Sequence, residues 1–138
     1  MPARQQQFPY ILITGARSPG FFHTENRQVP GLRELHKYPV VEIHPQTAEK
    51  EGINEGQWVI IESVRGKVRQ RAKIFGGIHP QVVGAQHAWW FPENKDPGHG
   101  WDESNINILT DNAYETCDPA MGATSVRTLL CKIYPEKT

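Results

Sequence analysis

The sequence predicts a mainly β fold, a small barrel of six or seven short strands with little helix. Runs of β-branched and aromatic residues alternate with turn-forming segments along the 138 residues. Glycine occurs 12 times and proline 11 times, which is typical of short strands joined by shaped loops. The length suits one domain with one core. A long crossing follows the first strand and the last strand is isolated, so we expect a barrel that is not a simple meander.

The first elements follow from local patterns. Residues 1–8 are expected to form a disordered lead. Residues 10–13 (YILI) form an apolar run that predicts a buried strand. Residues 32–37 carry two leucines three positions apart, which suits one or two helical turns. A second strand is expected over residues 38–43 (YPVVEI), and residues 44–52 fit a short helix with proline in its first turn and a terminal glycine.

The second half of the chain begins with a predicted hairpin. Residues 57–64 (QWVIIESV) and 67–74 (KVRQRAKI) are strands joined by an Arg-Gly turn. Another short strand is expected within residues 80–86, and residues 105–110 (NINILT) form either a short strand or an ordered turn. The final strand is predicted over residues 125–133 (SVRTLLCKI).

The return strand of this hairpin alternates between apolar and cationic residues. A cationic stripe could meet an anionic partner, but the solvated face of an antiparallel hairpin is the simpler interpretation. The inward residues are Val68, Ala72 and Ile74, and the outward ones are Lys67, Arg69, Arg71 and Lys73.

The charge balance and hydropathy narrow the function classes. Lys+Arg and Asp+Glu are 15 each, which argues against general binding of nucleic acid or of anionic membranes. No apolar stretch approaches the roughly 20 residues of a membrane span, and the N-terminus resembles no signal peptide. The isolated domain is therefore expected in the cytoplasm. The compartment of a longer parent protein stays open, because its export signal would lie upstream.

Several sequence motifs of self-contained enzymes do not occur. The sequence has no dinucleotide-binding glycine motif, P-loop, zinc-protease motif or nucleophile elbow. Its six histidines include no pair at the spacing of a helical metal site. Cys117 and Cys131 form neither a disulfide framework nor a metal knuckle, so they are interpreted as ordinary thiols. A hydrolase or zinc enzyme is not indicated.

The loop after the first strand has the composition of an anion-binding loop. Its glycines let backbone N–H groups approach an anion closely. Arg17 and Arg27 can donate paired hydrogen bonds to phosphate oxygens. Hydroxyl groups are added by Thr14, Ser18 and Thr24.

Five segments in order resemble the molybdopterin dinucleotide-binding domain, the C-terminal domain of the dimethyl-sulfoxide-reductase family, which includes formate dehydrogenases and nitrate reductases. The most specific segment is residues 44–72, with its HPQTAEKEGINEGQWVIIESVRG block. The resemblance covers nearly all of residues 9–134, so the domain is placed at residues 9–135. The other segments are TGAR with FHT in residues 14–24, HAWWFPE in 87–93, NINILT in 105–110 and CDPAMG in 117–122.

The resemblance implies a double-psi β-barrel with short helices and long loops at one end. In such domains these loops contact the two molybdopterin guanine dinucleotides that hold molybdenum or tungsten. The cofactor-binding residues carried over for the phosphate and pterin side are Thr14, Gly15, Arg17, His23 and Thr24. Those carried over for the other face of the loop end are His87, Trp89 and Asn105.

Two departures from the family pattern matter. Ala16 separates Gly15 from Arg17, which leaves the register of Arg17 open, and Cys117 stands where a small residue is usual. In the family the metal-binding residue and the Fe–S cysteines lie in other domains, so no catalytic or metal-binding residue is expected in this chain. The chain is expected to be catalytically incomplete alone.

Some further residues have both a functional and a purely structural interpretation. The aromatic run at residues 89–91 could cap the barrel or contact missing domains. Trp58 and its strand neighbours are interpreted as packing residues. Three loop carboxylates could bind guanine N–H groups or could simply be solvated: Asp102, Glu103 and Asp111.

Three functions remain open from the sequence. The first is the cofactor-binding domain of a larger molybdenum or tungsten oxidoreductase, with the Fe–S and metal-ligand domains as partners and with no direct contact to nucleic acid or membrane. The second is a stand-alone small subunit of such an enzyme. The third is a double-psi barrel that binds proteins. A self-processing decarboxylase on this barrel is not indicated because no Gly-Ser pair occurs. The substrate, and the choice between the two metals, stay open.

Overall fold

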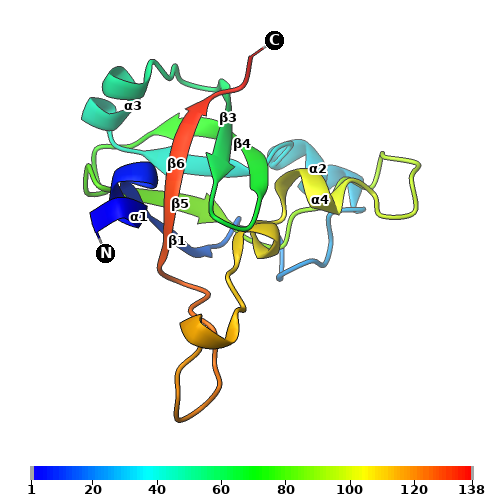
Figure 1. The fold of residues 1–138 in the computed structure, drawn as a ribbon. Coiled ribbons are helices and arrows are strands. Elements are labelled where there is room, and N and C mark those ends of the chain that lie inside the picture. The colour runs from blue at the N-terminus through cyan, green and yellow to red at the C-terminus, as the bar shows by residue number, and fades with distance from the viewer. Residues whose placement is uncertain (1, 138) are drawn as a thin grey trace.

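The computed structural model describes residues 2–137, and within that range six strands close into one barrel (Figure 1). Around the barrel the order is β1-β5-β2-β4-β3-β6. The pairs β1–β5 and β2–β4 are parallel and the other neighbours are antiparallel. Parallel pairs require crossover connections, so the barrel is the predicted double-psi type and not a meander. The strands are β1 (Tyr10–Ala16), β2 (Val40–Ile43), β3 (Trp58–Glu62), β4 (Lys67–Ile74), β5 (Val82–Gln86) and β6 (Leu129–Pro135).

The helices of the described chain are all short. They are α1 (Pro2–Gln7), α2 (Pro30–Leu35), α3 (Pro45–Glu51) and α4 (Trp101–Ser104), with 3₁₀ turns η1 (Ile106–Leu109) and η2 (Tyr114–Thr116). Of the two alternatives predicted for residues 105–110, the structure therefore has the ordered turn and not the short strand. The final strand begins at Leu129, four residues later than predicted. Across residues 2–137, no helix has the length and apolar character needed to span a bilayer.

The N-terminal segment corrects one prediction. Residues 2–7 form helix α1, so the expected disordered lead was wrong there, and Met1 lies outside the described residues. The physical reason is the residue that follows the helix. Phe8 is only 4% exposed, and the Lys132 ammonium of β6 lies 5.8 Å from the centre of its ring. Burial of one phenyl group ties the segment to the barrel.

The core fills the barrel with the inward residues of all six strands. Alternation along each strand buries every second side chain, as in β1, where Tyr10, Leu12 and Thr14 are buried. Cys131 is one of these core residues, and burial raises the pKa of its thiol to about 12. This cysteine therefore behaves as a small apolar residue.

The outward cations of β4 are mostly engaged within the domain. Arg69 pairs with Glu103 at 2.8 Å and with Glu136 at 3.2 Å, and Lys73 pairs with Glu42 at 3.1 Å. The guanidinium of Arg71 lies 4.6 Å from both the Tyr38 and the Trp58 ring centres. This face is therefore neither freely solvated nor an open cationic stripe.

Helix α3 has the ends that the sequence predicted. The imidazole Nδ1 of His44 accepts a hydrogen bond from the Gln46 N–H at 3.2 Å, and Pro45 occupies the first turn. Gly52 ends the helix in the left-handed conformation with φ of 67°. A Cβ on Gly52 would meet no atom within 4 Å, so only the backbone conformation favours glycine here.

Replacing Gly52 by alanine is expected to reduce the free energy of unfolding by about 1 kcal/mol, because an L-residue is strained at this φ. Urea unfolding measures the change. Gly31→Ala is the matched control: Gly31 lies inside α2 at ordinary φ with open space around it, so alanine should leave stability equal or higher. Equal losses in both variants would contradict the assignment.

Candidate functional site

The parallel pairing of β1 with β5 brings two loops together. Ala16, at the end of β1, pairs with Gln86 at the end of β5. The loop over residues 17–29 and the loop over residues 87–100 therefore leave the barrel side by side. Both lie on the side of the barrel that carries α2 and α4 (Figure 1).

A cavity of about 310 Å³ lies where these loops meet residues 106–107 and 126–127. Among its lining residues are two arginines, two histidines, a threonine and an asparagine, but no carboxylate. Such a lining favours an anionic ligand. The lining residues are Thr14, Gly15, Arg17, His23, His87, Ile106, Asn107, Val126 and Arg127.

The two histidines of the cavity form a hydrogen-bonded pair. Nδ1 of His23 lies 3.1 Å from Nε2 of His87, and Nδ1 of His87 lies 3.1 Å from the carbonyl oxygen of Ala16. Burial lowers the pKa of His87 below its usual value, and the nearby His23, Arg17 and Arg27 lower it further against the opposing effect of the Ala16 carbonyl. His87 is therefore held neutral near pH 7.

Arg27 fixes the backbone of both histidines. Its guanidinium carbon lies over the rings of Phe21, at 4.7 Å from the ring centre, and Trp89, at 4.6 Å. It donates hydrogen bonds to the carbonyl oxygens of His23, at 2.5 Å, and His87, at 3.4 Å. Burial, together with Arg33, lowers the pKa of Arg27 to about 10, so the group stays charged at neutral pH. One buried cation thus joins the two loops.

Comparison with known proteins identifies the family. Residues 10–129 match the family described as the Molydopterin dinucleotide binding domain. The chain belongs to this family. It is a molybdopterin dinucleotide-binding domain of the type found in molybdenum and tungsten oxidoreductases, and the cofactor of this group is molybdopterin guanine dinucleotide.

Curated relatives include much longer enzymes. The chain is 44% identical over 131 residues to a dopamine dehydroxylase of Eggerthella lenta, covering 95% of this chain and 13% of that protein. It is 39% identical over 120 residues to formate dehydrogenase 2 subunit alpha of Nitratidesulfovibrio vulgaris, covering 82% of this chain and 12% of that protein. The chain thus spans about one eighth of the length of these relatives.

A solved structure supports the fold of the family domain. Acetylene hydratase from Pelobacter acetylenicus superposes with a TM-score of 0.91 at 26% identity. The superposition covers 96% of this chain and 19% of that one. The whole barrel and its loops therefore correspond to one domain of a larger enzyme.

The structure brings together five of the eight predicted cofactor-binding residues of the family domain. Thr14, Gly15, Arg17, His23 and His87 all line the cavity. The other three do not line it, and each has a structural contact instead.

Those three residues support the loops. Trp89 is 0% exposed and donates its indole N–H to the side-chain oxygen of Gln86 at 3.1 Å. The backbone carbonyl of Thr24 accepts the indole N–H of Trp90 at 2.7 Å. Asn105 caps η1 by accepting the Asn107 N–H at 3.1 Å.

Sequence reasoning missed the other four cavity residues, which are Ile106, Asn107, Val126 and Arg127. The hydroxyl of Thr14 donates a hydrogen bond to the carbonyl of Val126, which holds Arg127 at the cavity. An arginine in the segment that leads into the last strand was the available signal. It lies more than 100 residues from Thr14, so no local pattern connects the two.

Sequence reasoning also missed Gln70, which is 0% exposed. Its amide nitrogen donates to the carbonyls of Gln86, at 2.8 Å, and Ser104, at 3.2 Å, and its oxygen accepts the Gln86 N–H at 3.1 Å. Three backbone groups at the two ends of the 87–104 segment are thereby satisfied by one side chain. The signal was a polar residue at an inward position of the alternating strand β4.

Two of the three loop carboxylates considered for guanine binding are engaged in ion pairs. Glu103 pairs with Arg69, and Asp111 pairs with Arg65 at 2.5 Å. Burial raises the pKa of Asp111, but the hydrogen bonds from Arg65 and from the Ala113 N–H outweigh it and hold the pKa below its usual value. Asp102 is exposed.

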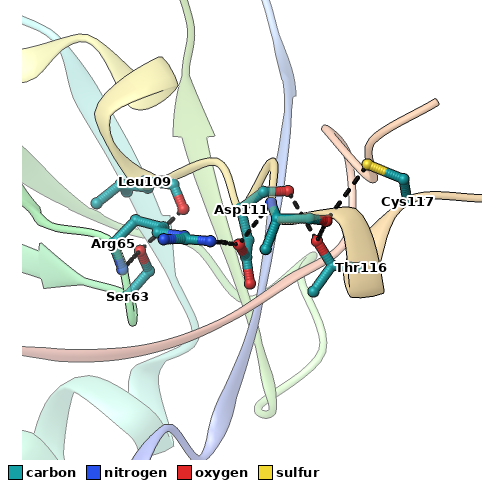
Figure 2. Close-up of polar contacts among 7 residues, drawn as sticks. Ser63, Arg65, Leu109, Asp111, Thr116 and Cys117 are labelled. Atoms are coloured by element: carbon teal, nitrogen blue, oxygen red, sulfur yellow. Dashed lines mark hydrogen bonds and ion pairs between the residues drawn. The ribbon is translucent and has the colours of Figure 1, made fainter. Parts of the chain in front are cut away.

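The Asp111 pair belongs to a wider polar network, which Figure 2 shows. The hydroxyl of Ser63 donates to the Leu109 carbonyl at 2.8 Å and accepts the Arg65 N–H at 3.1 Å. The thiol of Cys117 donates to the Ala113 carbonyl at 3.4 Å. The bonds of Ser63 and Arg65 attach the base of residues 110–128 to the turn between β3 and β4, and the Cys117 bond lies within that segment. Within residues 2–137, no cluster of three or more His, Cys, Asp or Glu side chains could hold a metal ion.

Arg27→Lys is expected to lower the free energy of unfolding by about 1–3 kcal/mol, because lysine keeps the charge but loses the broad contact of the guanidinium with two rings and the paired donors. Urea unfolding checks this. The control Arg17→Lys changes an exposed arginine of the same loop and should stay within about 0.5 kcal/mol. If Arg27→Lys were as stable as the wild type, the guanidinium contacts of Arg27 would not hold the loops together.

Proposed function

We propose that residues 9–135 bind the diphosphate and pterin part of molybdopterin guanine dinucleotide as one domain of a larger molybdenum or tungsten oxidoreductase. The observation that carries the proposal is the cavity at the paired ends of β1 and β5. It presents Arg17, Arg127 and His23 with no opposing carboxylate. Family membership makes a dinucleotide the anion to expect there.

The residues of the cavity fit a diphosphate. Two guanidinium groups on separate segments can each donate paired hydrogen bonds to phosphate oxygens. Gly15 lines the cavity at ordinary φ, and a Cβ there would meet no protein atom within 4 Å. The protein itself therefore does not require glycine at this position, whereas a ligand close to the backbone would.

The hydroxyl group of Thr14 can only accept hydrogen bonds from a ligand, although a threonine hydroxyl can usually also donate. Its hydroxyl hydrogen is donated to the Val126 carbonyl, so toward a ligand the oxygen offers lone pairs only. We assign it to accept an N–H of the ligand and not to bind phosphate. Asn107 is exposed and can offer both a donor and an acceptor beside it.

The bound cofactor supplies the redox chemistry, and this domain binds and orients it. Relatives with this domain bear the names of a dehydroxylase, a dehydrogenase and a hydratase. Their different reactions support the view that the domain holds the cofactor and does not select the substrate.

The two alternative functions find less support. The relatives carry this domain within chains many times longer, which favours a domain over a stand-alone small subunit. A protein-binding barrel would need no cavity with converging arginines. The larger chain is expected to contribute the remaining contacts to the cofactor, including the Fe–S and metal-ligand domains.

Binding is tested with GDP-mannose, a guanosine diphosphate diester that imitates the cofactor tail, titrated into the nitrogen-15-labelled chain. Amides near residues 14–17, 87 and 126–127 should shift together, with a Kd on the order of 1 mM. Arg17→Ala should weaken binding about tenfold through the loss of charge-assisted hydrogen bonds. The control Lys95→Ala removes an exposed charge from outside the cavity and should bind like the wild type. Saturation at residues far from the cavity, or no shift at several millimolar, would refute the proposal.

The variant Gly15→Val tests ligand binding separately from the stability of the fold. The Cβ of valine would meet no protein atom within 4 Å, and valine suits a strand, so the free energy of unfolding should fall by less than about 0.5 kcal/mol. Its side chain would occupy part of the cavity, so GDP-mannose should bind at least about tenfold more weakly. Unchanged affinity would show that the ligand does not approach the β1 backbone.

A further inference from the structure

The hydrogen bonds of the His23–His87 pair determine where its protons lie. Nδ1 of His87 faces the Ala16 carbonyl, which only accepts, so that nitrogen carries a hydrogen. In neutral His87, Nε2 is then an acceptor, and Nδ1 of His23 must donate to it. Neutral His23 is therefore the Nδ1–H tautomer, and its Nε2 carries a lone pair.

Nε2 of His23 makes no hydrogen bond within residues 2–137, and His23 lines the cavity. In the neutral pair this nitrogen can only accept, so it repels a phosphate oxygen. A proton taken up by the pair can lie on His23, or it can lie on His87 while His23 becomes the Nε2–H tautomer. In both arrangements Nε2 of His23 carries a hydrogen and becomes a donor.

We propose that the His23–His87 pair is a proton-linked binding element, which takes up one proton from solvent when the dianionic diphosphate binds and presents Nε2–H of His23 to it. The inference rests on the proposed function for the identity of the ligand. It adds that the cofactor's diphosphate is held by two arginines and one imidazole donor whose hydrogen appears only in the protonated pair. Affinity should therefore rise as pH falls.

The charges around the pair explain why binding of the diphosphate favours uptake of a proton by the pair. Arg17 and Arg127 line the same cavity, and Arg27 binds the carbonyls of both histidines. Burial, together with Arg17 and Arg27, disfavours a positive charge on His87, and no carboxylate lines the cavity to offset these cations. A dianion placed among them offsets most of this positive charge. Binding and protonation then favour each other by linkage.

Arg27 is a positioning residue for the His23–His87 pair. His23 has a φ of 51°, a left-handed conformation that is uncommon for a residue with a side chain. The bond from Arg27 to its carbonyl, together with the bond to the His87 carbonyl, holds the two rings within hydrogen-bonding distance. Arg27 itself does not line the cavity and so acts through the pair.

The tautomers are tested directly by two-bond proton–nitrogen NMR of the histidine rings in the 138-residue chain. At pH 8.5 both His23 and His87 should be Nδ1–H tautomers. An Nε2–H tautomer of His23 at this pH would overturn the inference. This measurement needs no ligand and no variant, so it does not depend on the folding of a mutant.

The proton linkage is tested with GDP-mannose, whose diphosphate diester keeps its charge between pH 5.5 and 8.5. The wild type should bind about tenfold more tightly at pH 5.5 than at 8.5. His23→Gln has no imidazole Nε2 that can become a donor, although His87 can still take up a proton, so its affinity should lose most of this pH dependence. His79→Gln, at a histidine outside the cavity, should keep the wild-type dependence. Binding with equal affinity at both pH values would overturn this inference alone, whereas no binding at either would overturn it together with the proposed function.

Discussion

The parallel pairing of β1 with β5 is the constraint on which the candidate site depends. Parallel strands end at the same edge, so the register that sets Ala16 against Gln86 also sets the two following loops side by side. In a meander the loops after consecutive strands would lie at opposite ends of the barrel. His23 and His87 are 64 positions apart and still form a hydrogen bond, because this pairing brings their loops to one edge.

Arginine serves two purposes in this domain, and the tertiary structure separates them. Arg27 contacts the rings of Phe21 and Trp89, and Arg71 contacts those of Tyr38 and Trp58 in the same way. A planar, weakly hydrated guanidinium suits such contacts and can still bond to carbonyls at its edge. The arginines that line the cavity, Arg17 and Arg127, make no ion pair within residues 2–137. Packing therefore uses one set of cations and leaves the other for a ligand.

The cavity is held in place by bonds at the bases of its loops. Gln70 satisfies backbone groups at both ends of the 87–104 segment, Arg27 joins the two histidine loops, and the Arg65–Asp111 pair anchors residues 110–128 (Figure 2). A site formed in advance loses less entropy when the ligand binds. This suits the proposed role of the domain, which is to orient a cofactor that other parts of a larger enzyme also contact.

The sequence by itself determined the strands, the β3–β4 hairpin, the ends of α3 and the glycine- and arginine-containing loop after β1, because these follow from local alternation, turn residues and caps. Family resemblance added the barrel type and five residues that the structure places at the cavity. Only the tertiary structure decided the burial of Phe8 and Trp89, the inward amide of Gln70, the approach of Arg127 to Thr14 and the pairing of Asp111. Each of these depends on a contact between distant residues, such as the 112 positions between Thr14 and Val126, and no local pattern encodes which distant partner a side chain will meet.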